Sequence, residues 1–242
     1  MRLGVSFTLA AASGCSGPNA GSMGGTPDAS PMDGAPALSP DASDAGASSR
    51  PMVSATTSHA SMIGLSGDDS RLVVANRYGG SATVFSIDYA ADTLPTLAKL
   101  AEIAVGAEPS AVVIHPDGNT AFVLSRLDQK VTKITGLMTT PVKAGEVAVG
   151  SEPTGLAMTP LGSTLYVANW MDGTLTAIRT DTMAVTSTID LNAALAASAY
   201  PGPGLSTRPA LAHPRALAIT NNGDMVENDE TIYVTEYYAQ QK

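Results

Sequence analysis

A long internal repeat is the sequence feature that most constrains the fold of this chain. The segment PSAVVIHPDGNTAFV at residues 109–123 returns as PTGLAMTPLGSTLYV at residues 153–167, and both copies follow a Val-Gly-x-Glu sequence. Weaker copies occupy residues 61–76 and 214–236. Self-similarity with a period of about 40 to 50 residues is typical of repeat folds, in which each unit packs against its neighbours.

Within each unit, the apolar and β-branched residues favour short strands over helices. Residues 174–178 (TLTAI) and 185–189 (VTSTI) follow a period close to two. The dipeptides Asp117-Gly118 and Asp172-Gly173 provide the turn chemistry of tight hairpins, because glycine accepts positive φ. Each unit therefore offers about four short antiparallel strands, which is typical of a β-propeller blade.

Two of the repeats resemble a known family. LYVAN at 165–169 and IYVTE at 232–236, with the Pro-x-x-[Leu/Val]-x-[Ile/Met]-x-Pro-x-Gly pattern upstream, are similar to the YVTN repeat of secreted and surface β-propellers. The resemblance covers about residues 58–238 and implies a seven-bladed, all-β propeller of four-stranded antiparallel blades. Residues 53–242 have room for about four such blades. We therefore expect the N-terminal fragment of a longer propeller; the alternative is a half-ring that closes by dimerising.

The first 15 residues resemble a bacterial lipoprotein signal peptide. Arg2 precedes the apolar stretch Leu3–Ala12, and small residues then lead to Cys15, the only cysteine of the chain. The resemblance implies that Cys15 is lipidated and becomes the first residue of the mature protein at the outer membrane. The alternative is an ordinary secretory signal. With one cysteine, the chain forms no intramolecular disulfide.

Residues 16–52 are predicted to form a disordered tether. They consist almost entirely of Gly, Pro, Ser, Ala and Asp, with almost no large apolar side chain to offset the entropy of ordering. The whole chain carries 13 basic and 22 acidic residues, for a net charge of −9. This balance argues against nucleic acid as a partner, because phosphate binding needs clustered Lys and Arg. The only membrane contact we expect is the lipid anchor.

Two sets of side chains are candidates for chemistry. His59, His115 and His213 are the only histidines, and we interpret them as surface or rim residues, leaving any metal site unassigned. Glu108 and Glu152 hold equivalent positions in adjacent repeats, so both should face the same end of the propeller. They either form part of an acidic ring that binds a cation or basic ligand, or cap backbone N–H groups of a turn; we favour the cap.

Three further features are weaker candidates. The loop 221–230 is rich in Asp, Asn and Glu, and we interpret it as a solvated acidic loop rather than a calcium site, because it lacks EF-hand spacing. Tyr166, Trp170 and Tyr237-Tyr238 either edge a binding face or pack between blades. We assign no catalytic residue and no cofactor, since the chain has neither Gly-x-Ser-x-Gly nor Cys-x-x-Cys-His.

The function expected from these features is binding rather than catalysis. A lipid-anchored propeller at the bacterial envelope would present a rim to a protein, a glycan or a small ligand. One alternative is the propeller part of a redox protein, with a cytochrome c domain beyond residue 242, as in some proteins with this repeat. Another is a lactonase-like hydrolase. Propellers host unrelated functions, so the repeat alone does not distinguish among these three functions.

The lipid anchor is directly testable. If the Cys15 thiol carries the lipid, Cys15→Ala should move the protein from the membrane fraction to the soluble fraction on cell fractionation. A Ser16→Ala variant serves as the control, because it leaves the thiol in place. Equal membrane retention of the Cys15→Ala protein would contradict the anchor.

Overall fold

The computed structural model describes residues 60–89, 94–197 and 212–236, all of which belong to one compact unit. The two boundaries predicted near residues 15 and 52, together with Cys15 and His59, lie outside the described residues and stay predictions.

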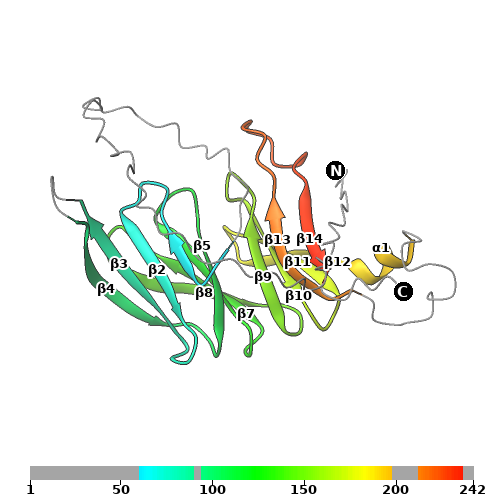
Figure 1. Cartoon of the computed structure of the whole chain (residues 1–242), viewed down its shortest axis with the longest axis horizontal. Helices are drawn as coiled ribbons and strands as arrows, with labels where there is room; N and C mark the ends of the chain where they lie inside the picture. The colour runs from blue at the N-terminus through cyan, green and yellow to red at the C-terminus, as the bar shows by residue number, and fades with distance from the viewer. Residues whose placement is uncertain (1–59, 90–93, 198–211, 237–242) are drawn as a thin grey trace, which may run out of the picture. The chain divides into compact units, whose positions relative to one another are not determined.

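The described chain forms three four-stranded antiparallel sheets and one two-stranded sheet in succession (Figure 1). The first sheet contains β1 (Ile63–Leu65), β2 (Arg71–Asn76), β3 (Ser81–Asp88) and β4 (Thr96–Ala104). The second contains β5 (Pro109–Ile114), β6 (Thr120–Ser125), β7 (Lys130–Thr135) and β8 (Val142–Ala148). The third contains β9 (Pro153–Met158), β10 (Thr164–Asn169), β11 (Thr174–Arg179) and β12 (Ala184–Asp190). The fourth contains β13 (Pro214–Ile219) and β14 (Ile232–Glu236).

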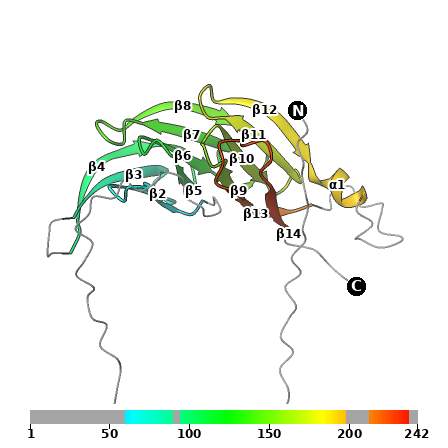
Figure 2. The ribbon, with the colours of Figure 1, turned by 90° about the horizontal axis from the view of Figure 1, so that it is seen from above.

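This topology is that of β-propeller blades. In each of the first three sheets the strands pair in sequence order, so every sheet is an up-and-down meander. The first strand of one sheet contacts the first strand of the next sheet, as in the pairs β1 with β5, β5 with β9, and β9 with β13. In the second and third sheets, the last strands β8 and β12 lie on the opposite side from β5 and β9 (Figure 2). The predicted all-β fold of four-stranded blades is confirmed.

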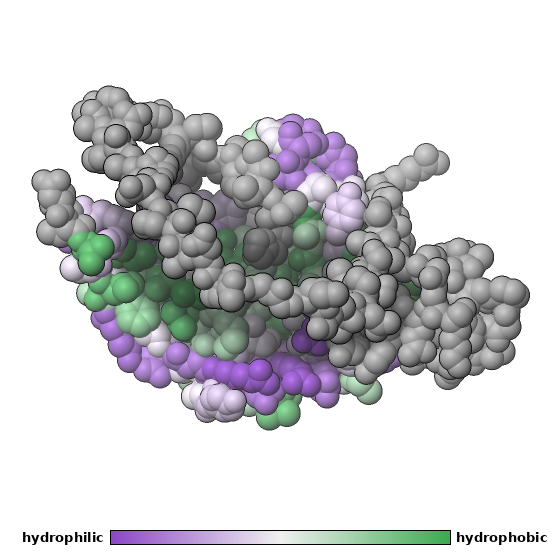
Figure 3. Space-filling model, viewed as in Figure 1, coloured by the Kyte–Doolittle hydropathy of each residue, from purple (hydrophilic) through white to green (hydrophobic). Residues whose placement is uncertain are grey.

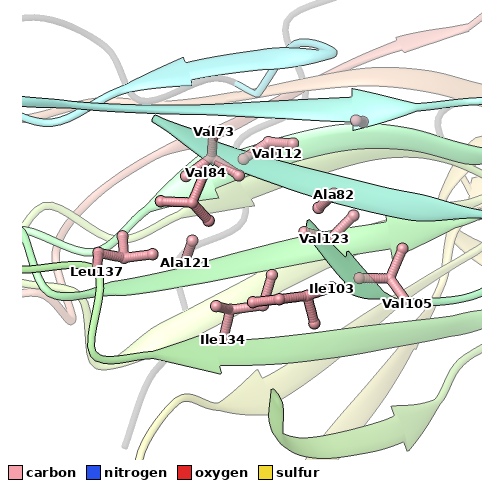
Figure 4. Close-up of a cluster of buried hydrophobic side chains, with 11 residues drawn as sticks. Val73, Ala82, Val84, Ile103, Val105, Val112, Ala121, Val123, Ile134 and Leu137 are labelled. Atoms are coloured by element: carbon pink, nitrogen blue, oxygen red, sulfur yellow. The ribbon is translucent and has the colours of Figure 1, made fainter. Parts of the chain in front are cut away.

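The blades are held together by apolar side chains on both faces of each sheet. Ala121 and Val123 on β6 pack toward the first sheet, in a cluster with Val73 and Val84 (Figure 4). Their neighbours Phe122 and Leu124 pack the other way, against Leu156, Leu165 and Ile178 of the third sheet. Because successive side chains of a strand point to opposite faces, a strand between two other sheets is apolar at nearly every position. All six residues of β6 are buried.

The predicted tight turns are present. Gly118 has φ 67° and Gly173 has φ 64°, values in the left-handed region that favours glycine. In the first of these turns, Asp117 Oδ1 accepts hydrogen bonds from the backbone N–H groups of Asn119 (2.8 Å) and Thr120 (2.9 Å). The Asp117-Gly118 pair therefore contributes both the backbone freedom and the acceptor that its turn needs.

One element was not predicted. Residues 191–197 form the helix α1 (Leu191–Ala197), directly after β12. Asp190 caps it, because its Oδ1 accepts hydrogen bonds from the N–H groups of Asn192 and Ala193. None of the helices in the described ranges has the length and apolar character needed to cross a bilayer.

The packing between sheets predicts a stability difference between two leucines. Leu165 on β10 is completely buried between the second and third sheets, whereas Leu97 on β4 is 58% exposed. We expect Leu165→Ala to lower the free energy of unfolding by about 2 to 5 kcal/mol, through lost burial and a residual cavity. Leu97→Ala should change it by less than about 0.5 kcal/mol. Urea titration followed by circular dichroism measures both values. Equal destabilisation by the two changes would contradict the packing described here.

Candidate functional site

One rim of the blades collects charged side chains from equivalent loops. Arg77 directly follows β2 and Arg126 directly follows β6, while Glu108 and Glu152 directly precede β5 and β9. In an up-and-down sheet, the end of the second strand lies beside the start of the first strand. Figure 3 shows hydrophilic residues along the lower edge, where the chain turns from β2 to β3 in Figure 1. We call Arg77, Glu108, Arg126 and Glu152 the rim row.

The backbone fixes the two glutamates in the same way. Glu108 has φ 52° and Glu152 has φ 47°, so both lie in the left-handed region. The Glu108 carbonyl accepts a hydrogen bond from Arg126 N–H at 2.9 Å, and the Glu152 carbonyl accepts one from Trp170 N–H at 3.1 Å. The repeat therefore places Arg126 and Trp170 at equivalent points of the rim.

Two aspartates brace these loops. Asp128 Oδ2 accepts a hydrogen bond from the backbone N–H of Ala107 at 3.0 Å, and Asp172 Oδ2 accepts one from Ser151 N–H at 2.8 Å. The predicted capping role of the glutamates thus belongs to these aspartates instead. The glutamate side chains face arginines.

The rim row alternates in charge along successive blades. Arg126 Nη2 donates a hydrogen bond to Glu152 Oε2 at 2.9 Å, and its Nη1 lies 3.6 Å from Glu108 Oε2. Arg77 Nη2 lies 3.7 Å from the same Glu108 oxygen. The hydrogen bond to Glu152 raises the pKa of Arg126, so this guanidinium stays charged. The prediction that Glu108 and Glu152 face the same end of the blades is confirmed, but Arg126 lies between the two carboxylates and pairs with both.

A cavity of about 460 Å³ opens beside the rim row. Its lining includes Arg77, Arg126 and Glu152 from the row, together with Trp170 and Arg215. Arg215 is on β13, and its Cζ lies 5.8 Å from the centroid of the Trp170 ring, a cation–π contact. We call this space the rim cavity. A second space of about 470 Å³ adjoins it and shares Arg77.

A half-buried carboxyl group lies close to this site. Glu236, the last residue of β14, accepts a hydrogen bond from the backbone N–H of His213. Burial raises the pKa of Glu236 to about 6, although that hydrogen bond opposes the shift. The His213 ring lies edge-on to Trp170, with 5.5 Å between the ring centroids.

The two histidines that the structure describes, His115 and His213, lie at opposite rims of the blades. His115 follows the end of β5 and pairs with Asp117, with 3.2 Å between Nδ1 and Oδ2. His213 precedes the start of β13, so it belongs to the opposite rim. Within residues 60–89, 94–197 and 212–236, no group of three or more His, Cys, Asp or Glu side chains is placed to hold a metal ion.

The other candidates have packing or loop roles. Glu227 of the acidic loop accepts hydrogen bonds from Leu161 N–H, at 2.6 Å, and from the Ser163 hydroxyl, which ties that loop to the third sheet. Tyr166 is buried between the third and fourth sheets, whereas Trp170 lines the rim cavity. Tyr237-Tyr238 lie outside the described residues.

Arg77, Arg126 and Arg215 were not predicted as site residues. A signal for two of them was present, because Arg77 and Arg126 each stand one position after an aligned strand, where Trp170 stands in the third unit. Arg215 stands where Ser110 and Thr154 stand in earlier units, the second position of the first strand. Extending the repeat alignment by one residue would have found the first two.

No family model matches this chain, and no curated protein matches it. Solved structures with similarity include hydrazine synthase from Kuenenia stuttgartiensis, at 23% identity and TM-score 0.48 over 72% of this chain and 47% of that one. A putative 6-phosphogluconolactonase from Bacteroides fragilis has 21% identity and a TM-score of 0.44, over 52% of this chain and 36% of that one. The periplasmic gluconolactonase of Pseudomonas aeruginosa has 18% identity and a TM-score of 0.43, over 52% of this chain and 38% of that one. This chain spans less than half the length of each of the three. Likeness at this level does not assign an activity.

The raised pKa of Glu236 predicts a pH effect on stability. Because the folded state binds this proton more tightly than the unfolded state, the stabilisation is complete below about pH 4.5 and is lost as pH rises through about 6. The full shift corresponds to about 2 kcal/mol, and solvent screening of this partly exposed side chain makes the loss smaller. We expect Glu236→Gln to remove this component, and denaturant titrations at pH 4.5 and pH 7 measure it. An identical pH dependence in the wild type and the variant would contradict the assignment.

Proposed function

We propose that this chain is a non-catalytic binding module and that the rim carrying the rim row is its binding face. The observation that carries the proposal is the row itself, with a cavity beside it. Four charged side chains come from equivalent loops of successive blades, and the rim cavity has a volume in the range of small-molecule sites.

The ion pairs of the rim row contribute little to the stability of the fold. The side chains of Arg77 and Glu108 are 42% and 36% exposed, and those of Arg126 and Glu152 are 36% and 45% exposed. Ion pairs with this exposure contribute about 0 to 1 kcal/mol each. The apolar clusters between the sheets contribute far more to holding the blades together.

The rigidity of the scaffold also supports a binding role. The rim side chains stand directly at the ends of strands that pair along their length, so their backbone positions are fixed before a ligand arrives. Preorganised polar groups bind with a smaller entropic cost than groups on long loops.

The place of action is part of the proposal. We propose that lipidation of Cys15 holds the module at the bacterial cell envelope, with residues 16–52 as the tether between the lipid and the blades. This arrangement would leave the rim accessible to a ligand outside the cytoplasm.

A hydrolysis assay tests the non-catalytic role. The full chain is incubated with glucono-δ-lactone, and acid release is followed in a pH-stat. We expect the spontaneous rate, unchanged in Glu152→Gln. A rate above the spontaneous one, lost in Glu152→Gln but kept in Glu102→Gln, would overturn the proposal in favour of a hydrolase. Glu102 is the control because it is an exposed glutamate on β4, paired with Lys99.

A further inference from the structure

The lining of the rim cavity is more basic than acidic, although the protein as a whole is acidic. Three of the lining residues, Arg77, Arg126 and Arg215, carry guanidinium groups, whereas one, Glu152, carries a carboxylate. The whole chain has a net charge of −9. A cavity lined by more guanidinium groups than carboxylates favours an anionic ligand.

The guanidinium group of Arg77 has N–H donors available for a ligand. Of the residues that the structure describes, none accepts a hydrogen bond from its side chain, and Glu108 is its ion-pair partner at 3.7 Å. Arg77 lines both the rim cavity and the adjoining space. A guanidinium presents a planar fork of N–H donors, which matches the two oxygens of a carboxylate.

The remaining polar lining suits hydroxyl groups. Glu152 offers carboxylate oxygens as acceptors, and the Thr154 hydroxyl donates to the Pro214 carbonyl at 2.9 Å, which leaves its oxygen lone pairs toward other donors. Ser110, at the equivalent position of the second blade, adds a further hydroxyl to the cavity. Several acceptors beside a cationic fork fit a molecule that carries both hydroxyl groups and one carboxylate.

We propose that the rim cavity binds a small hydroxylated carboxylate of the uronic acid type, with its carboxylate on Arg77 and Arg126 and its hydroxyl groups on Glu152 and Thr154. The proposal rests on the binding role proposed above and names the ligand class for the same site.

Three matched sugars separate charge from shape. Isothermal titration of the full chain, in a non-ionic detergent without sugar groups, is carried out with D-galacturonate, D-galactose and D-galactosamine. The ring and most hydroxyl groups are shared, while the charge is negative, zero and positive. We expect saturable binding of galacturonate, and at least tenfold weaker binding of the other two.

Matched arginine variants locate the site. Arg77→Gln should weaken galacturonate binding by about tenfold or more, since it removes a charge-assisted hydrogen bond. Arg126→Gln is the second variant and should weaken binding by a similar factor, so that failure of one protein to fold leaves the test intact. Arg179→Gln is the control, because Arg179 is an exposed arginine at the end of β11 that pairs with Asp181, and it should bind like the wild type.

The outcomes separate the ligand class from the binding role. Tighter binding of galactose or galactosamine than of galacturonate, lost in Arg77→Gln, would keep the binding role and overturn the ligand class. Tighter binding of inorganic phosphate than of galacturonate would also overturn the class. Absence of galacturonate binding, or equal binding by the Arg77→Gln and Arg179→Gln proteins, would overturn the proposed site. Failure of the binding role itself would appear separately, as lactone hydrolysis.

Discussion

Apolar packing between neighbouring sheets is the interaction on which the rest of the structure depends. Each inner sheet contributes both faces to it: Val123 packs toward the first sheet, whereas the adjacent Phe122 packs toward the third. A sheet buried on both faces cannot shift its register by one residue without exchanging two complete sets of apolar contacts. The outermost strands β8 and β12, by contrast, are largely exposed, and their sequences are more polar. The repeat therefore sets the spacing between blades as well as the fold of each blade.

That fixed spacing gives the rim its geometry. Glu108 and Glu152 start equivalent strands, so the packing of β5 against β9 sets how far apart they are held, and Arg126 pairs with both. The aspartates Asp128 and Asp172 hold the loops by the same bond in two blades. Variation at one loop position, arginine in the first two units and tryptophan in the third, then changes the chemistry of the rim without changing its framework. Such a scaffold separates the residues that fold the protein from those that face a ligand.

The fold was predictable because its determinants recur along the chain. The prolines that begin β5, β9 and β13, the Asp-Gly turns and the β-branched runs each repeat, and together they indicated four-stranded blades. The helix α1 was missed because it is seven residues long and depends on one cap at Asp190. For the site, the shared position of Glu108 and Glu152 followed from the repeat. Their pairing with arginines could not be predicted from the repeat, since it joins side chains of different blades. Arg215 in particular reaches Trp170 only through the packing of β13 against the third sheet.

The proposed binding role depends on rim arginines that hold a ligand carboxylate. A crystal structure of the full chain with D-galacturonate would locate that carboxylate. We expect the ligand in the rim cavity, with its carboxylate oxygens within hydrogen-bonding distance of the Arg77 and Arg126 guanidinium groups and its hydroxyl groups on Glu152 and Thr154. A ligand bound elsewhere on the blades, or one whose carboxylate points away from both arginines, would contradict it.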